Sequence, residues 1–198
     1  MLLYDSPVSG NCYKVRLLFA QLRLRYERRE LSVVDRSDRE RVLGALNPAR
    51  RVPTLVLDDG RVLAESNAIV WYFADGTPYL PDDRFDRAKV LQWLFFEQYD
   101  HEPAIAVVRF WVAFAASPPP APEIEARRAA GYRALDAMER VLRDAPYLVA
   151  GRYTIADIAL YAYTHVATEG GFDLDGYPAI DAWLRRVAGQ PGHAAIGD

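Results

Sequence analysis

Residues 46–69 read LNPARRVPTLVLDDGRVLAESNAI, and this stretch decides the fold of the first part of the chain. It combines a strand, a tight turn, a second strand and the beginning of a helix, which we place at residues 54–57, 58–60, 61–64 and 66–73. Ser66 is a residue type typical of helix N-caps. Pro53 stands directly before the first strand, where it cannot donate to a strand ladder. The stretch therefore predicts a β-hairpin followed by a helix.

The residues before this stretch add two more strands and two more helices. An apolar run at residues 1–4 predicts a strand, and apolar residues then recur from Cys12 at the spacing of one helical face. Residues 26–34 alternate imperfectly, which predicts another strand, and residues 38–46 predict a short helix. Because strand–helix–strand units need a crossover, this order predicts a small mixed sheet with helices on both faces.

The second half of the chain has helical patterns alone. Residues 87–114 form one long apolar-rich segment, in which Pro103 is expected to kink or break the helix. Three more amphipathic segments follow, at residues 123–142, 154–166 and 180–187. We therefore predict three parts of the chain: an α/β domain, a linker and an all-helical domain, at residues 1–76, 77–86 and 87–198.

The composition excludes several classes of protein. Of the 198 residues, 51% are apolar, and 27 acidic against 24 basic residues give a formal net charge of −3, so a disordered chain and a typical nucleic-acid binder are excluded. A single cysteine, Cys12, excludes an internal disulfide and a metal site built from several thiolates. The longest apolar run, residues 110–116, is shorter than the roughly 20 residues of a membrane span. We expect a cytoplasmic protein with no secretory signal, metal, membrane or nucleic-acid partner.

The segment 6–12 joins the first strand to the first helix and holds the first candidate site residues. Loops at the carboxyl ends of strands bind ligands in α/β folds, and a helix N-terminus stabilises an anion such as a thiolate. Ser9 and Asn11 can both donate a hydrogen bond there, although either residue type also serves as an ordinary helix cap. Cys12 falls on the apolar face of the helix, so we expect a buried structural thiol rather than a nucleophile.

Two further positions each allow two interpretations. The Val52-Pro53 bond is either trans, at the start of an edge strand, or cis, in a bend that leaves the Val52 N–H and C=O free to pair with a peptide-like ligand. Ser66 either caps its helix only or binds a ligand carboxylate together with the first helical N–H groups. The residues by themselves leave both pairs of alternatives open.

Together these motifs resemble the cytosolic glutathione S-transferase family, in its bacterial form with a serine-type active site. The resemblance covers almost the whole chain and depends on the joint spacing of Ser-x-x-Cys at the first helix, Val52-Pro53 and Glu65-Ser66. Residues 151–157, GRYTIAD, resemble the family's capping box, in which Thr154 and Asp157 bond reciprocally to each other's backbone N–H. We assign that box a structural role.

The resemblance implies a thioredoxin-like first domain, a cis bond before Pro53, and glutathione as a co-substrate. It implies that Val52 pairs with the cysteinyl backbone of glutathione. Glu65 and Ser66 would hold the γ-glutamyl end, and Arg51 would lie near the glycyl carboxylate.

The resemblance also implies a catalytic residue near the first helix. Ser9 best matches the serine-type position, where its hydroxyl would donate to the glutathione sulfur and favour the thiolate. Asn11 is a rival donor, whereas Tyr4 lies too early in the chain for the tyrosine type. Arg50 stands where many relatives have glycine, which places a charge at the rim of the glutathione site.

For the electrophile, the resemblance implies a pocket between the domains. Its candidate lining residues come from the first loop and the first long helix of the second half: Val8, Tyr99, Arg109, Phe110 and Trp111. Aromatic residues at helical spacing also occur as plain core residues, which is the alternative for these positions. The family implies a homodimer, in which Asp100 would contact the glutathione amine across the interface. We interpret His101 as structural or solvent-facing.

We therefore expect a glutathione S-transferase that activates the glutathione thiolate for attack on a hydrophobic small-molecule electrophile. One alternative is glutathione-dependent reduction of a peroxide or disulfide. Another is a non-catalytic glutathione-binding adaptor or stress protein. The intact Ser9, Val52-Pro53 and Glu65-Ser66 favour glutathione binding, and none of them demonstrates turnover.

Overall fold

The computed structural model describes residues 1–198, and the chain forms two compact units. The first unit comprises Met1–Asp75 together with Pro191–Asp198, and the second comprises Gly76–Gln190. None of the helices has both the length and the apolar character needed to cross a membrane.

This division differs from the predicted one at both ends of the second unit. Residues 77–86 belong to the helical unit, because Leu80 is buried and the Tyr79 carbonyl accepts the Ile155 N–H at 3.0 Å. Residues 191–198 belong to the first unit, because side chains of that unit bond to their backbone. Both departures arise from contacts between residues far apart in the chain.

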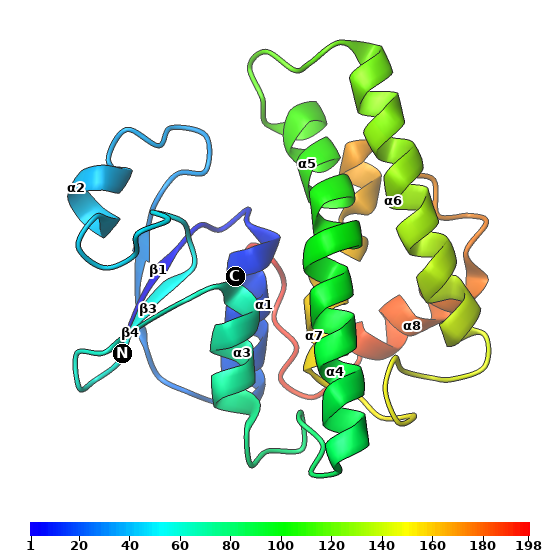
Figure 1. The fold of residues 1–198 in the computed structure, drawn as a ribbon, viewed down its shortest axis with the longest axis horizontal. Helices are drawn as coiled ribbons and strands as arrows, with labels where there is room; N and C mark the ends of the chain where they lie inside the picture. Colours follow the sequence, from blue (N-terminus) through cyan, green and yellow to red (C-terminus); the bar gives the residue numbers. More distant parts are fainter. The chain divides into compact units, whose positions relative to one another are not determined.

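The first unit is a four-stranded mixed sheet covered by helices. Its elements in chain order are β1 (Leu2–Asp5), α1 (Gly10–Gln21), β2 (Glu27–Glu30), α2 (Arg39–Leu43), β3 (Thr54–Val56), β4 (Val62–Ala64) and α3 (Ser66–Ala74). The strand order is β2-β1-β3-β4, with β1 parallel to β2, and β3 antiparallel to both of its neighbours. Helices α1 and α3 lie side by side on one side of the sheet, and α2 lies on the other (Figure 1). The thioredoxin-like fold of the first domain is thus confirmed.

Alternating apolar residues of the strands supply both faces of this sheet. Tyr4 forms a buried cluster with Leu31 and Leu43, the second of which belongs to α2. Leu3 and Leu55 are opposite each other in the β1–β3 register and are fully buried. Because successive side chains of a strand point to opposite faces, Tyr4 and Leu3 bury the two sides of β1.

Strand β2 is shorter than the predicted strand at residues 26–34. Its four residues, ERRE, are all exposed. It pairs with β1 alone and forms one edge of the sheet. Charged side chains on an edge strand oppose pairing with a strand of another chain. This role explains why β2 lacks the expected alternation of apolar and polar residues.

The second unit is helical, as predicted. Its elements are α4 (Arg84–Phe96), the π-helix η1 (Glu97–His101), α5 (Glu102–Ala113), α6 (Ala121–Leu142), α7 (Ile155–Thr164), the 3₁₀-helix η2 (Ala167–Gly170) and α8 (Pro178–Ala188). Pro103 does not break the long segment, because it lies in the first turn of α5, where its missing N–H is tolerated. The five-residue π-helix before it carries the chain from α4 into α5 without a loop.

The predicted capping box begins α7. The Thr154 side chain caps the helix, and its N–H donates to Asp157 Oδ2 at 2.9 Å. Asp157 Oδ1 also accepts the Leu148 N–H at 3.1 Å and the Trp183 Nε1–H at 2.9 Å. One buried carboxylate therefore joins the start of α7 both to α8, through Trp183, and to the loop that precedes α7, through Leu148.

Candidate functional site

The loop between β1 and α1 places Ser9 at the N-cap of α1. Ser9 Oγ accepts the Cys12 N–H at 3.3 Å, so the capping interpretation of this serine is correct. The Ser9 side chain is half-buried, and its hydroxyl also hydrogen-bonds the Cys12 sulfur, a contact that lowers the pKa of that thiol but is outweighed by burial. Because a thiol is a weak acceptor, the Ser9 hydroxyl remains a donor that a stronger acceptor can take over at the positive end of the helix dipole.

Cys12 is fully buried and follows Ser9 by one helical turn. Burial, with a smaller contribution from the negative charge of Asp5, raises the pKa of the Cys12 thiol to about 12. A thiol with this pKa stays protonated at neutral pH and is a poor nucleophile. The expectation of a structural cysteine therefore agrees with the environment of its sulfur.

Asn11 lies in a partly buried polar cluster that joins the starts of α1 and α3. Its Oδ1 accepts hydrogen bonds from Lys14 Nζ at 2.8 Å and from Ser66 Oγ at 3.2 Å. Lys14 Nζ also lies 3.3 Å from Ser66 Oγ and 3.4 Å from Asn67 Oδ1. The Ser66 hydroxyl therefore donates to Asn11, so it is committed within the protein.

The peptide bond between Val52 and Pro53 is cis, as the family resemblance implied. Neither the N–H nor the C=O of Val52 bonds to another protein group. The buried Asn47 holds the flanking chain, with Nδ2 donating to the Arg51 carbonyl at 3.1 Å and to Thr54 Oγ1 at 2.9 Å. Val52 thus presents a donor and an acceptor on a braced backbone, and the Arg51 side chain is exposed beside it.

Glu65 precedes α3 with a φ of +66°, a left-handed conformation that non-glycine residues adopt rarely. Such a conformation costs of order 1–3 kcal/mol, and it occurs most often at functional sites. The Glu65 side chain is exposed and makes no cap bond to the helix. The N–H of Ser66, which heads α3, has no protein acceptor.

Arg50 also has a positive φ, of +52°, where glycine would be unstrained. Its guanidinium forms an exposed ion pair with Glu40. The charge expected at the rim of the site is therefore partly compensated by a neighbour on α2.

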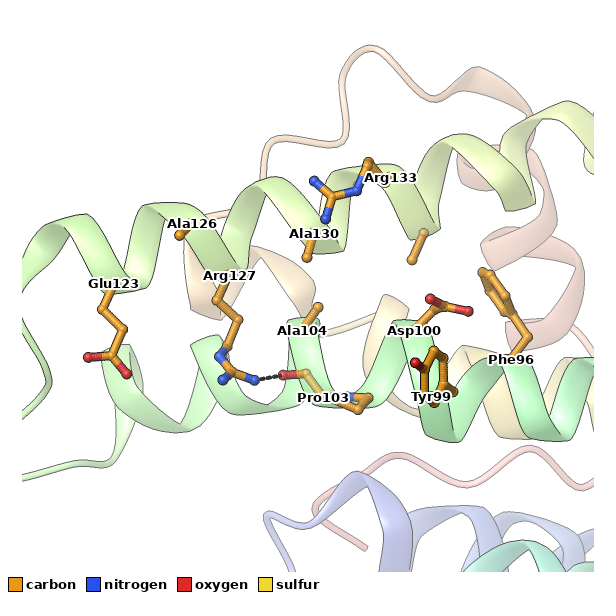
Figure 2. A pocket seen from close by; sticks show the side chains of 11 residues that line it. Phe96, Tyr99, Asp100, Pro103, Ala104, Glu123, Ala126, Arg127, Ala130 and Arg133 are labelled. Carbon is orange, nitrogen blue, oxygen red and sulfur yellow. Dashed lines mark hydrogen bonds between the residues drawn. The ribbon is translucent and has the colours of Figure 1, made fainter.

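The second unit contains a groove of about 540 Å³ between α6 and the α4–η1–α5 segment (Figure 2). Tyr99 and Asp100 line it from η1, opposite Arg133 on α6. Arg127 closes one part of the groove by donating to the Pro103 carbonyl at 2.7 Å. The groove combines an aromatic ring with charges of both signs.

The predicted electrophile residues do not gather in this groove. Of the five candidates only Tyr99 lines it, and Val8 belongs to the first unit. Arg109 is buried and donates through Nε to Glu169 Oε2 at 2.8 Å. The Arg127 guanidinium lies over the Trp111 ring, with its Cζ 5.0 Å from the ring centroid. Within the second unit, Tyr99, Arg109 and Trp111 thus lie in three different environments and do not line one common pocket.

Two other predicted positions have clear local roles. Phe110 stacks on Phe114 with ring centroids 6.5 Å apart. His101 is fully buried, with Nε2 at 2.8 Å from Thr164 Oγ1, and Thr164 donates to the Leu160 carbonyl. The structural interpretation of His101 agrees with this contact, whereas the solvent-facing one is wrong.

Sequence reasoning missed Lys14 and Arg16, the two buried cations of α1. Lys14 organises the cluster of Asn11 and Ser66, and Arg16 holds the loop that precedes Ser9. A signal was present, because two cations sit among the apolar residues of a helix that is buried on most sides. The structure places no group of three or more His, Cys, Asp or Glu side chains where they could hold a metal ion.

Comparison with known proteins gives two family matches that together cover most of the chain. Residues 3–79 match the model of the glutathione S-transferase N-terminal domain, and residues 88–191 match that of the glutathione S-transferase C-terminal domain. A solved glutathione S-transferase from Pseudomonas fluorescens is 48% identical, with a TM-score of 0.94 over 100% of this chain and 98% of that one.

Two curated relatives are more distant and carry different names. Glutathione S-transferase 2 of Anopheles gambiae is 29% identical over 97% of this chain and 92% of its own length. The disulfide-bond oxidoreductase YfcG of Escherichia coli is 27% identical over 96% of this chain and 90% of its own length.

Proposed function

Because this chain belongs to the glutathione S-transferase family, we propose that its first unit binds glutathione and that Ser9 activates the glutathione thiol for attack on an electrophilic carbon. One observation carries the proposal: the side chain of Ser9, a hydroxyl that can donate a hydrogen bond, caps the N-terminus of α1. In the reaction, the thiol proton leaves to solvent while Ser9 donates a hydrogen bond to the sulfur anion. A sulfur lone pair then forms the S–C bond, and the leaving group departs with the bonding electrons.

Four backbone and side-chain features supply the proposed binding mode. The N–H and C=O of Val52 pair with the cysteinyl backbone of glutathione, as an added strand pairs with a sheet edge. The Glu65 carboxylate holds the γ-glutamyl ammonium, and the N–H of Ser66 holds the γ-glutamyl carboxylate at the head of α3. The exposed Arg51 pairs with the glycyl carboxylate.

The energy that Ser9 has to supply is modest. Each unit by which the thiol pKa falls corresponds to about 1.4 kcal/mol of preferential thiolate stabilisation. One charge-assisted hydrogen bond together with a helix N-terminus supplies roughly one to two such units. Activation therefore needs no metal and no thiol of the protein, and the buried Cys12 plays no part in it.

Ser9 is favoured over Asn11 as the donor. The Asn11 carbonyl oxygen accepts from Lys14 and Ser66, which ties that side chain into the cluster between α1 and α3. We assign Asn11 the role of fixing the start of α1 against α3, and Ser9 the role of hydrogen-bonding the sulfur.

The test is a titration of glutathione with the protein near neutral pH, with detection of the bound thiolate by its ultraviolet absorbance. We expect a thiolate signal in the native protein and a loss of about tenfold or more in thiolate fraction in Ser9→Ala. Ser32→Ala is the matched control, because Ser32 Oγ also accepts backbone N–H groups two and three residues later in an exposed turn. A full signal in Ser9→Ala with a lost signal in Asn11→Ala would reverse our assignment.

A second function, glutathione-dependent disulfide reduction, is supported by the relative named disulfide-bond oxidoreductase YfcG. In this reaction the activated glutathione thiolate attacks one sulfur of the disulfide, and the other sulfur leaves as a thiolate. A second glutathione thiolate then attacks the glutathione sulfur of the mixed disulfide, which releases the second thiol and forms glutathione disulfide. Parallel assays with an activated aryl halide and with a small disulfide separate the two reactions. Glutathione binding without turnover of either would favour the non-catalytic binding role.

We also propose a homodimer in the cytoplasm, where the single buried thiol and a glutathione co-substrate suit a reducing compartment. Leu91, Phe95 and Tyr99 follow one another at four-residue spacing on α4 and η1, with exposed fractions of 37%, 70% and 84%. An exposed row of large apolar side chains is typical of an association surface. Asp100, beside this row, would then reach the glutathione amine of the partner subunit.

A further inference from the structure

The segment Pro191–Asp198 packs with the first unit although it follows the last helix of the second. Tyr13 Oη on α1 donates to the Ala194 carbonyl at 2.7 Å. Gly192 has a φ of +73°, and a Cβ added there would lie 3.1 Å from the Gln21 Cα. The segment is therefore seated closely on α1, and one glycine permits its approach.

Arg16 on α1 joins this segment to the loop that carries Ser9. Its Nη1 donates to the Ser6 carbonyl at 3.2 Å, and its Nη2 donates to the Pro7 carbonyl at 3.0 Å. The same Nη2 donates to the Ile196 carbonyl. One buried guanidinium thus holds two loop carbonyls and one carbonyl of the 191–198 segment.

A buried carboxylate fixes the orientation of that guanidinium. Asp5, at the end of β1, is fully buried and accepts from Arg16 Nη1 at 2.6 Å, while Arg28 Nη2 lies 2.8 Å from its other oxygen. Arg28 Nη1 in turn donates to the Asp198 carbonyl at 2.7 Å. The segment therefore meets the first unit through both arginines that neutralise Asp5.

A single shared acceptor, the Ser6 carbonyl, connects the Arg16 guanidinium to the Ser9 backbone. The Ser6 carbonyl that accepts from Arg16 also accepts the Ser9 N–H at 3.1 Å. The Ser9 carbonyl accepts the Tyr13 N–H at 2.9 Å and so starts α1. A displacement of the Ser6 carbonyl therefore moves the Ser9 backbone and changes where its hydroxyl can donate.

We propose that Arg16 is a positioning residue for Ser9 and that the 191–198 segment completes the set of acceptors that holds Arg16 in place. This inference rests on the proposed activation of glutathione by Ser9. Without the Ile196 carbonyl, Nη2 loses one of its two acceptors, and the guanidinium is held only by Asp5 and by the two loop carbonyls that it positions. The Ser6–Ser9 turn then samples more than one geometry, and the hydroxyl meets the sulfur less often at hydrogen-bonding distance.

The first experiment deletes residues 195–198, which removes the Ile196 and Asp198 carbonyls but keeps the Tyr13–Ala194 contact. We measure the pKa of the glutathione thiol bound to the protein by ultraviolet titration, together with kcat, KM for glutathione and Tm. We expect the bound-thiol pKa to rise by about half to one unit and kcat below that pKa to fall about three- to tenfold, with KM changed less than twofold.

The second experiment compares two buried arginines. Arg16→Lys keeps the positive charge beside Asp5 but loses the planar pair of donors, so it should reproduce the rise in bound-thiol pKa. Arg39→Lys is the matched control, since Arg39 is also buried in the first unit but donates to the Ser32 carbonyl and not to the loop between β1 and α1. It should lower Tm while leaving the bound-thiol pKa unchanged.

The outcomes separate this inference from the proposed function. A native protein with no thiolate signal would refute the activation by Ser9. A native signal with an unchanged thiol pKa in both the deletion and Arg16→Lys would refute the positioning role alone, even if Tm fell. An equal pKa rise in Arg39→Lys would mean that general loosening of the unit is the cause, which would also overturn the proposal.

Discussion

The ammonium group of Lys14 lies 2.8 Å from the Asn11 side-chain carbonyl oxygen, which is one turn earlier on α1. The same ammonium group reaches Ser66 Oγ at 3.3 Å on α3, although the two residues are 52 positions apart in the chain. Lys14 is fully buried, so its charge is held among side-chain oxygens instead of water. The contact ties the helix that carries Ser9 to the helix that heads the proposed γ-glutamyl site.

Replacing Lys14 by methionine should weaken glutathione binding. Hydrogen bonds to a buried charged group contribute about 1.5–3 kcal/mol, and their loss frees Asn11 and Ser66 to move. We expect the dissociation constant for glutathione, measured by calorimetry, to rise about tenfold. Lys89→Met is the control, because Lys89 is the other lysine of the chain and donates to Gln92 on the exposed side of α4. Equal affinity in the two variants would show that the cluster does not support the site.

Cys12→Ala should retain activity in full. The raised pKa, about 12, keeps the Cys12 thiol neutral at every pH of practical assay, and its burial blocks reagents. A thiol-specific chromogenic reagent should therefore react with the native chain at pH 8 far more slowly than with the unfolded chain. The substitution removes a buried sulfur and should cost about 1–2 kcal/mol of unfolding free energy, as measured by urea denaturation. Loss of turnover in a folded Cys12→Ala protein would indicate a cysteine mechanism.

Local patterns predicted several features of both units well. The hairpin of β3 and β4, the start of α3 at Ser66 and the capping box at Thr154 each depend on residues close together in the chain. Strand β2 was predicted too long, because an edge strand of charged residues carries no alternation to mark its ends.

The remaining differences come from contacts over long sequence separations. Lys14 lies two residues after Cys12 on a helix whose apolar face is clear, and only the approach of α3 shows that it is buried. The 191–198 segment has a composition typical of a loop, and its place on α1 depends on Arg16 and Tyr13, more than 170 residues earlier. The π-helix at residues 97–101 has no pattern that would separate it from the flanking α-helices.

Phe95→Glu should disrupt the proposed homodimer. Phe95 is 70% exposed on α4, between Leu91 and Tyr99, and a carboxylate there would have to be desolvated in an interface. Light scattering after size-exclusion chromatography should give the native protein twice the mass of the variant, whose Tm and helix content stay close to native. Val112→Glu, at a half-exposed position of α5, is the control and should remain dimeric. If the native protein itself is a monomer, the proposed homodimer is wrong.

The buried carboxyl of Asp157 should make stability depend on pH between about 4 and 6. Burial raises its pKa from 3.8 to about 6 despite bonds from Trp183, Leu148 and Thr154, which lower it. The folded state therefore holds a proton in this range that the unfolded state has lost, so stability falls as the pH rises through this window. Between pH 5 and pH 7 the group should lose about 1 kcal/mol of its contribution to the free energy of unfolding.

Urea denaturation of the native protein and of Asp157→Asn at pH 5 and pH 7 measures this contribution. The asparagine cannot accept all of the bonds that the carboxylate accepts, so the variant should be less stable at both values. Because the variant has no titrating group at this position, the stability difference between the two proteins should be larger at pH 5 by about 1 kcal/mol. An equal difference at pH 5 and pH 7 would mean that the folded-state pKa of Asp157 is not raised above its unfolded value, so that the bonds to Trp183, Leu148 and Thr154 offset burial.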